Sequence, residues 1–248
     1  MNGGEPPITV WRVIGVVRRV LIVFVLTLGF GAPSGAQPSP EHTSFCRESS
    51  RRIATVDTRG LGALYCTTND GLAGTLHGIH RSARPVFYGA VPLAWGAAGF
   101  RGEGYAGAYQ LTVAQGATYG LVLGLKHLVG RPRPFVTRAL VSRSSHYGAS
   151  QGERYQSFPS GHAALSAAIV TSVGLTYPRW YVLGPGTVWA TGVSLSRLYL
   201  GVHYPSDVLV GAALGVGMAI LVHQMRHAVT PSRLAGGEGR GVGLRIQF

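Results

Sequence analysis

From residue 85 onward, long apolar segments alternate with short polar breaks. They are rich in Gly, Ala and Val, and each is about 15 to 20 residues long, which is too long for an ordinary strand. The segments are Pro85–Phe100, Ala106–Leu125, Ala163–Tyr177, Trp180–Leu195 and Val208–Val222. Small residues allow helices to pack closely. The pattern therefore predicts an all-α protein, a bundle of five to six core helices.

The chain before this bundle has a different character. Basic residues at Arg12, Arg18 and Arg19 precede a short apolar run and small residues ending at Ala36. This is typical of a signal peptide, and the alternative is an uncleaved N-terminal anchor, so residues 1–36 are assigned to one or the other. In either case we expect the chain that follows to leave the cytoplasm.

The remaining boundaries follow changes in composition. Residues 37–84 are polar and broken by Pro, Ser and Gly, which predicts an external cap with one or two short helices, including 70–80. Residues 85–227 form the predicted helical domain, and residues 228–248 a Gly-rich tail. The cap residues His77, His80 and Arg81 could face the site, although solvated surface positions are expected for them. Cys46 and Cys66 are the only cysteines, and outside the cytoplasm we expect a disulfide rather than two free thiols.

The overall charge adds little to the predicted fold and function. Net charge is +13, but charged residues make up only 12% and hydrophobic residues 46% of the chain. The arginines are scattered and form no long basic run, so a nucleic-acid partner is not expected. A mean hydropathy of +0.22 lies between a soluble globule and a typical multispan membrane protein.

Three polar motifs lie at the ends of the apolar segments. Arg197, His203 and Asp207 lie between the last two segments, and the Asp follows the His by four positions. A carboxylate that orients an imidazole is the arrangement of a nucleophile or base, although a structural His–Asp pair that caps a helix has the same spacing.

The other two motifs bring anion-binding groups. Ser160, Gly161 and His162 precede the third segment, where a hydroxyl and backbone N–H groups at a helix start favour anions. Lys126 and Arg133 follow the second segment. Because consecutive helices of a bundle run antiparallel, all three motifs are expected at one end.

Together, K-x6-RP, PSGH and SR-x5-H-x3-D resemble the signature of the type 2 phosphatidic acid phosphatase family, which also contains vanadium haloperoxidases and bacterial class A acid phosphatases. The resemblance covers roughly residues 85–222. It implies a phosphoric monoester hydrolase without a cofactor or metal. It also implies that His203 is the nucleophile aligned by Asp207, that a phospho-histidine forms, and that His162 is the general acid.

The residues themselves support this chemistry. Phosphoryl transfer spreads negative charge over three equatorial oxygens, so fixed donors are required. These donors are predicted to be Lys126, Arg133, Arg197, Ser160 and Gly161. The loop 131–159 is long enough to be a lid over the site, and within it Arg138 and Arg143 are expected to face solvent.

The substrate and the setting stay open at this point. A phosphorylated lipid or lipid pyrophosphate is favoured, in a bundle that spans the envelope membrane with its site facing outward, because Arg101, Arg179 and Arg226 would then be cytoplasmic. The segments are short for spanning, so a soluble periplasmic acid phosphatase is the alternative. A vanadate-dependent haloperoxidase and a non-enzymatic membrane scaffold or transporter are the other hypotheses. Oligomeric state is not encoded in any pattern.

Overall fold

The computed structural model describes residues 40–49, 54–102, 104–138, 140 and 151–235, and every regular element within these ranges is a helix. The predicted all-α fold class is therefore confirmed. The predicted signal peptide or anchor at residues 1–36 lies outside the described residues, as does the tail beyond residue 235.

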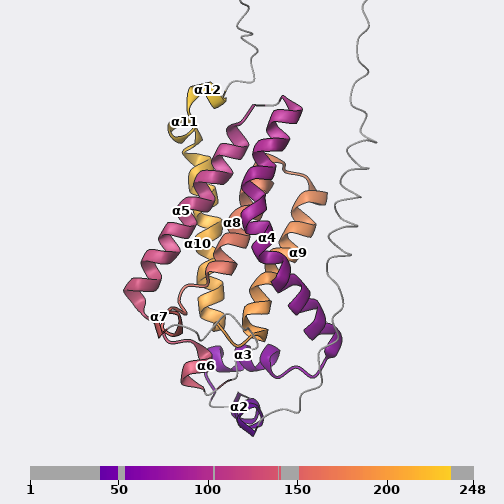
Figure 1. The fold of residues 1–248 in the computed structure, drawn as a ribbon, viewed down its shortest axis with the longest axis vertical. Coiled ribbons are helices and arrows are strands. Elements are labelled where there is room, and N and C mark those ends of the chain that lie inside the picture. The colour runs from indigo at the N-terminus through magenta and orange to yellow at the C-terminus, as the bar shows by residue number, and fades with distance from the viewer. Residues whose placement is uncertain (1–39, 50–53, 103, 139, 141–150, 236–248) are drawn as a thin grey trace, which may run out of the picture.

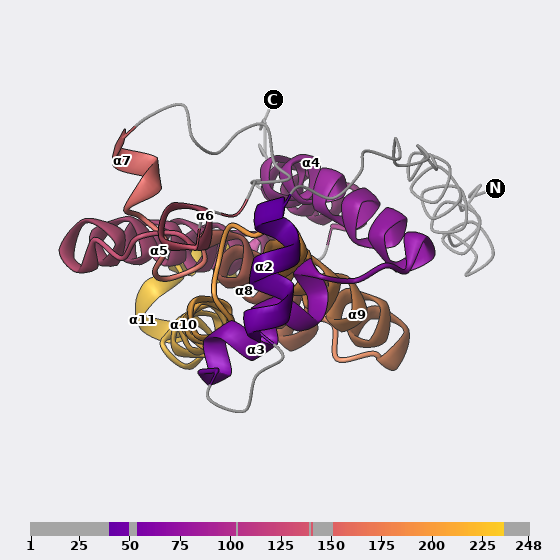
Figure 2. The same cartoon turned by 90° about the horizontal axis from the view of Figure 1, so that it is seen from below.

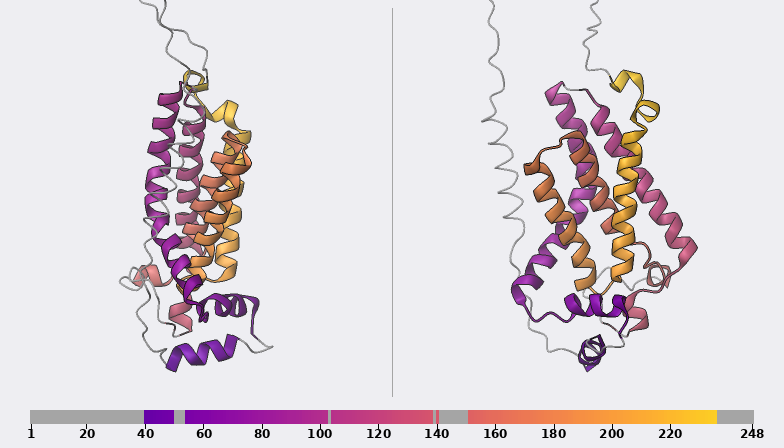
Figure 3. Two further views of the ribbon diagram at one scale, coloured as in Figure 1. Left: turned by 90° about the vertical axis from the view of Figure 1, so that its right-hand side faces the viewer. Right: turned by 180° about the vertical axis from the view of Figure 1, so that it is seen from behind.

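Five long helices form the bundle (Figure 1). They are α4 (Asp70–Arg101), α5 (Ala106–Val129), α8 (Gly161–Thr176), α9 (Trp180–Tyr199) and α10 (Pro205–Gln224). Short helices α6 (Pro134–Thr137) and α7 (Gln151–Arg154) lie in the predicted lid loop, and α11 (Arg226–Val229) and α12 (Ser232–Ala235) follow the bundle. Helices α2 (Pro40–Ser49) and α3 (Val56–Tyr65) cross one end of it, opposite α11 and α12 (Figure 3).

Helix α4 differs from the prediction. The sequence indicated a short helix near 70–80 and a separate helix from Pro85, but the structure has one continuous helix with Pro85 and Pro92 inside it. Proline weakens a helix locally without ending it when neighbouring helices hold both halves. The helix begins at an Asn69 cap and ends at Gly102, whose φ of 65° suits glycine. The predicted boundary between residues 84 and 85 thus falls within a helix.

The closest helix pair in the bundle is α8 against α10. A Cβ at Gly211 would lie 2.4 Å from the Ser160 carbonyl oxygen, and one at Gly215 would lie 2.0 Å from the Ala164 carbonyl oxygen. Only glycine permits this approach of two backbones. The approach also fixes the start of α8 against the start of α10, since the Ser160 N–H donates to the Asp207 carbonyl at 2.9 Å.

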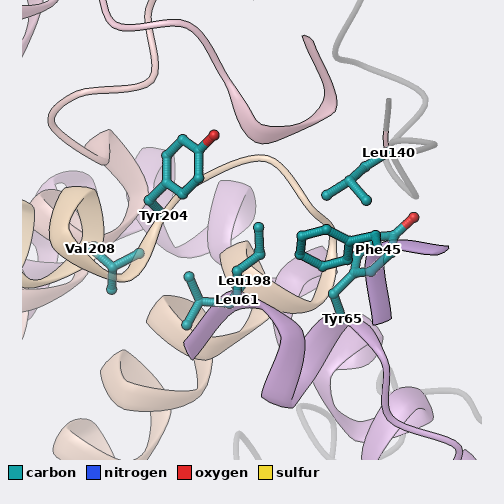
Figure 4. Packing of buried hydrophobic residues seen from close by; sticks show 8 residues of the cluster. Phe45, Leu61, Tyr65, Leu140, Leu198, Tyr204 and Val208 are labelled. Carbon is teal, nitrogen blue, oxygen red and sulfur yellow. The ribbon is translucent and has the colours of Figure 1, made fainter. Parts of the chain in front are cut away.

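Helices α2 and α3 form a cap on the bundle (Figure 2). The Cys46–Cys66 disulfide joins the two, which confirms the predicted pairing. Apolar side chains of the cap then pack on the ends of α9 and α10 (Figure 4). The labelled members are Phe45, Leu61, Tyr65, Leu140, Leu198, Tyr204 and Val208. The cap is therefore attached to the end of the bundle that carries the motifs.

Within the described residues, one helix has the length and apolarity to cross a membrane. It is α10, with a mean hydropathy of 1.8 over its best window, of which only 33% is buried. Large apolar side chains are also exposed on other helices, among them Leu93 on α4 at 73% and Val188 on α9 at 71%. The bundle thus presents apolar side chains outward over several helices.

Candidate active site

The structure brings the three motifs to the capped end of the bundle (Figure 1). Lys126 lies in the last turn of α5, and Arg133 is the N-cap residue of α6. Ser160 caps α8, Arg197 lies in the last turn of α9, and Asp207 lies in the first turn of α10. Gly161 and His162 are the first two residues of α8.

His203 lies in the turn between α9 and α10, and its side chain is only 2% exposed. The Arg133 guanidinium faces its Nε2 at 3.1 Å. Because a guanidinium can only donate, Nε2 must accept and the ring proton must lie on Nδ1. Nδ1 faces the Asp207 carboxylate, with a separation of 3.6 Å from Oδ2. The neutral ring therefore has its lone pair on the nitrogen that points toward the cationic groups.

Asp207 is fully buried and held on both carboxylate oxygens. Oδ2 accepts from the Tyr204 backbone N–H at 2.9 Å and from the Ser157 hydroxyl at 2.5 Å. Oδ1 accepts from the Arg131 guanidinium at 2.6 Å. A buried charge needs such partners. At 3.6 Å, the His203–Asp207 separation is longer than a hydrogen bond, as is common in catalytic pairs without substrate.

The predicted anion-binding cations surround His203. Burial, together with the charges of Arg133, Lys126 and Arg197, holds the pKa of His203 well below its usual value of 6.5. Arg133 is 4% exposed and is fixed by donation to the carbonyls of Glu153 and Val202, at 2.6 Å and 3.0 Å. The Lys126 ammonium donates to the Gln156 carbonyl. These basic side chains are thus held in place by backbone oxygens.

The start of α8 completes the pocket. The Ser160 hydroxyl and the His162 Nε2 are both buried, and neither has a hydrogen-bond partner within the described part of the chain. Unpaired buried polar atoms are costly unless a ligand meets them. A hydroxyl, an imidazole nitrogen and the free N–H groups of a helix start form an arrangement that suits an anion.

Arg197, in the last turn of α9, has no solvent exposure. Its Nη1 lies 2.8 Å from Nδ1 of His80 on α4, which must accept for the same reason that His203 Nε2 does. The prediction that His80 would be a solvated surface residue was therefore wrong. No local pattern marks His80, because its partner lies 117 positions away in the sequence.

Two lid-loop arginines also differ from expectation. Arg131 was not assigned to the site, yet it binds Asp207 directly. Arg138 was expected in solvent, but it forms an ion pair with Glu48 of the cap at 2.8 Å. Arg143 lies outside the described residues. Ser157, which binds Asp207, was also missed, although it directly precedes the Phe158–His162 motif.

A groove of about 630 Å³ lies between α4, α5 and α8. Three of its lining residues, Lys126, Gly161 and His162, lie at the ends of α5 and α8 that carry the motifs. The rest of the lining is mostly apolar or aromatic, with Arg84 as a second basic residue. The full lining is Arg84, Phe87, Tyr88, Val91, Thr112, Gln115, Gly116, Tyr119, Val122, Leu123, Lys126, Gly161, His162 and Leu165.

The depressed pKa of His203 predicts a pH-dependent stability. The unfolded chain binds a proton at His203 near pH 6.5, whereas the folded chain does not until a much lower pH. The contribution of His203 to the free energy of unfolding is therefore complete above pH 6.5. Below pH 6.5 it falls by about 1.4 kcal/mol per pH unit. Thermal unfolding of the wild type and His203→Gln between pH 7.5 and 5 should show a steeper decline for the wild type. Parallel curves would contradict the assignment of a neutral, buried His203.

The fold and the site together define a class: an all-helical bundle with a buried, carboxylate-adjacent histidine facing several fixed cations at one end. The family model described as PAP2 superfamily matches residues 107–231, just over half of the 248 residues. The chain belongs to this superfamily of type 2 phosphatidic acid phosphatases, and the predicted resemblance is confirmed.

Individual relatives match shorter parts of the chain than the family model does. Lipid A 1-phosphatase of Rhizobium johnstonii is 34% identical over 39% of this chain and 38% of the relative. Undecaprenyl-diphosphatase of Sulfolobus acidocaldarius is 33% identical over 46% of this chain and 54% of the relative. Phosphatidylglycerophosphatase B of Escherichia coli is 43% identical over 26% of each. The chain thus spans about half the length of these relatives, or less.

Two solved structures share the fold. Aquifex aeolicus LpxE has a TM-score of 0.58, with 22% identity, over 69% of this chain and 97% of that one. A transmembrane PAP2-type phosphatidylglycerolphosphate phosphatase from Bacillus subtilis has a TM-score of 0.53, with 19% identity, over 87% of this chain and 98% of that one. At these identities the likeness concerns the arrangement of the helices.

Proposed function

We propose that this protein hydrolyses a phosphate monoester or pyrophosphate of a membrane lipid through a phospho-histidine intermediate. The observation that carries the proposal is the buried neutral His203, whose Nε2 faces Arg133 and whose pKa is lowered by burial and by three neighbouring cations. A nucleophile with its lone pair directed at a cationic pocket is suited to attack a phosphorus atom whose oxygens those cations hold.

The residues divide the reaction between them. His203 Nε2 forms a bond to phosphorus while the ester P–O bond breaks. His162, in the protonated form that the negative charge of bound phosphate favours, gives its proton to the departing oxygen. Asp207 stabilises the positive charge that develops on His203. Water then attacks the phosphorus, His162 takes the proton, and the P–N bond breaks to release phosphate. Lys126, Arg133, Arg197, Ser160 and the Gly161 N–H stabilise the equatorial oxygens.

We also propose that the bundle lies in a membrane. The window of α10 that suits a membrane span is only 33% buried, whereas a core helix of a soluble protein would be mostly buried. Leu93, Val188 and Leu209 are 73%, 71% and 70% exposed, on three different helices. Contact with lipid tails accounts for such a surface.

The orientation follows from charge. Arg101 and Arg179 lie at the ends of α4 and α9 that are opposite the site, and Arg226 follows α10 at that same end. Cytoplasmic loops carry an excess of basic residues. This charge distribution supports a site that faces the periplasm or exterior.

The groove between α4, α5 and α8 is where we place the lipid tail. Its lining includes Lys126 and His162 from the motifs, and the rest is mostly apolar or aromatic. The relatives named above act, by their names, on lipid A, undecaprenyl diphosphate and phosphatidylglycerophosphate. All three carry phosphate on a lipid, and a groove that holds the tail would direct the phosphate toward His203.

A substrate panel in detergent micelles with a metal chelator present tests this function. We expect phosphate release from at least one of phosphatidate, phosphatidylglycerophosphate, undecaprenyl diphosphate and lipid A, with kcat/KM about tenfold or more above that for p-nitrophenyl phosphate. Complete loss of activity on chelation would contradict the metal-free reaction. Halide oxidation dependent on added vanadate, without phosphate release, would favour the haloperoxidase alternative.

A pair of glycine variants tests the groove. Gly116 lines it, and a Cβ there meets nothing within 4 Å, so Gly116→Leu should fill the groove without strain. We expect kcat/KM for the lipid to fall by about tenfold or more while the value for p-nitrophenyl phosphate stays unchanged. Gly120→Leu is the matched control on the same helix, because Gly120 is equally open and does not line the groove. Equal effects of both variants would rule out this path for the tail.

A further inference from the structure

Asp57, at the start of cap helix α3, binds two groups next to the catalytic histidine. Its Oδ2 accepts from the Arg131 guanidinium at 2.8 Å and from the Ser206 hydroxyl at 2.7 Å. Its Oδ1 accepts from the Ser206 backbone N–H at 2.9 Å. Asp57 lies outside the region that the family model matches, which begins at residue 107.

The contact with Ser206 acts on helix α10. Ser206 is the second residue of α10, and its N–H is one of the donors that a helix start leaves without an intrahelical partner. A carboxylate at this place satisfies the donor and is favoured by the helix dipole. The helix start is therefore held by a side chain from the cap, one residue before Asp207.

Arg131 connects Asp57 to the Asp207 carboxylate. Arg131 lies between two carboxylates, since Nη2 binds Asp57 and Nη1 binds Asp207 at 2.6 Å. Its guanidinium also lies 4.3 Å above the Tyr204 ring, which fixes its plane. With Asp57 present, the charge of Arg131 is shared, so Asp207 keeps net negative charge toward His203. Without Asp57, the same guanidinium would neutralise Asp207 more fully.

The charge state of Asp57 agrees with this arrangement. Partial burial alone would raise its pKa, but hydrogen bonds from Arg131 and Ser206 outweigh that effect and hold the pKa below the ordinary value. The cap itself is fixed close to α10, because a Cβ at Gly60 would lie 2.7 Å from Pro205. Asp57 therefore meets the network as a fixed negative charge.

We propose that Asp57 is a positioning residue, through which the cap sets the charge and orientation of Asp207 and hence of His203. The cap is then a part of the catalytic apparatus rather than a cover. Asp57 contacts no group that we place on the substrate, so its removal should slow the chemical step and leave substrate binding largely unchanged.

The test compares Asp57→Asn with a matched control, Glu48→Gln. Both variants remove one cap carboxylate from an ion pair with a lid-loop arginine, but the Glu48 pair with Arg138 involves neither Asp207 nor His203. The Asp57 side chain is 24% exposed, so its amide is expected to be accommodated. For Asp57→Asn we expect kcat to fall by about 10-fold to 100-fold, with KM little changed. Glu48→Gln should stay within about twofold of the wild type.

The kinetic arm rests on the proposed phosphatase activity, so a spectroscopic arm is added that does not. In histidine-labelled protein, the Nδ1 and Nε2 resonances of His203 are assigned by their loss in His203→Gln. They should shift in Asp57→Asn and stay in place in Glu48→Gln. An unchanged His203 signal in Asp57→Asn would overturn the inference, whether or not the wild type releases phosphate. Equal kinetic and melting effects of the two variants would assign Asp57 a purely structural role.

Discussion

His203→Gln is expected to release phosphate from the lipid substrate at least about 10⁴-fold more slowly than the wild type, because the variant has no group that can form the phospho-enzyme. Glutamine keeps a similar length and can still accept from Arg133, whose Nη1 lies 3.1 Å from the His203 Nε2. The loss should therefore fall on kcat, while the cationic pocket still binds the substrate.

The measurement has a chemical and a kinetic part. Rapid quenching of the wild type with ³²P-labelled substrate should trap an acid-labile, alkali-stable phosphate on the protein, and His203→Gln should trap none. His227→Gln is the matched control, since His227 is exposed on α11 at the far end of the bundle. Residual activity within tenfold of the wild type would exclude His203 as the nucleophile, and labelling at His162 would exchange the two roles.

Much of the fold followed from the sequence because its signal is local. The apolar segments and their polar ends gave α5, α8, α9 and α10 to within a few residues. The prediction failed at Pro85, since proline is a local helix-breaking signal and only contacts with neighbouring helices keep α4 continuous through it. The cap disulfide was predictable because the chain has only two cysteines.

The residues of the site likewise fall into those that the sequence predicted and those that it did not. Its motif residues are close to one another in sequence within each helix end, so their chemistry was visible before the structure. Asp57, Arg131 and His80 act through partners that are 74, 76 and 117 positions away. Such contacts depend on how the helices pack, which no spacing along one helix encodes. The sequence thus predicts the groups that we expect to face the substrate, but it does not predict the groups that position them.

Arg197 gives the second large effect, and its geometry makes a conservative replacement informative. The side chain is fully buried and reaches His80 Nδ1 at 2.8 Å while its charge acts on His203. A guanidinium can bind His80 with one nitrogen and two phosphate oxygens with others, whereas an ammonium is a single compact charge. A lysine at position 197 therefore keeps the positive charge but cannot contact His80 and two phosphate oxygens at the same time.

We expect Arg197→Lys to lower kcat/KM by about 10²-fold to 10³-fold, which is the scale for removal of a fixed donor to the transition state. Arg101→Lys is the matched control, because Arg101 ends α4 at the opposite end of the bundle and should change kcat/KM by less than about twofold. His80→Asn retains an acceptor near the Nδ1 position and should lose much less activity than His80→Ala. If Arg197→Lys retained wild-type kcat/KM, the charge alone would suffice, and the proposed bidentate contact with phosphate would be wrong.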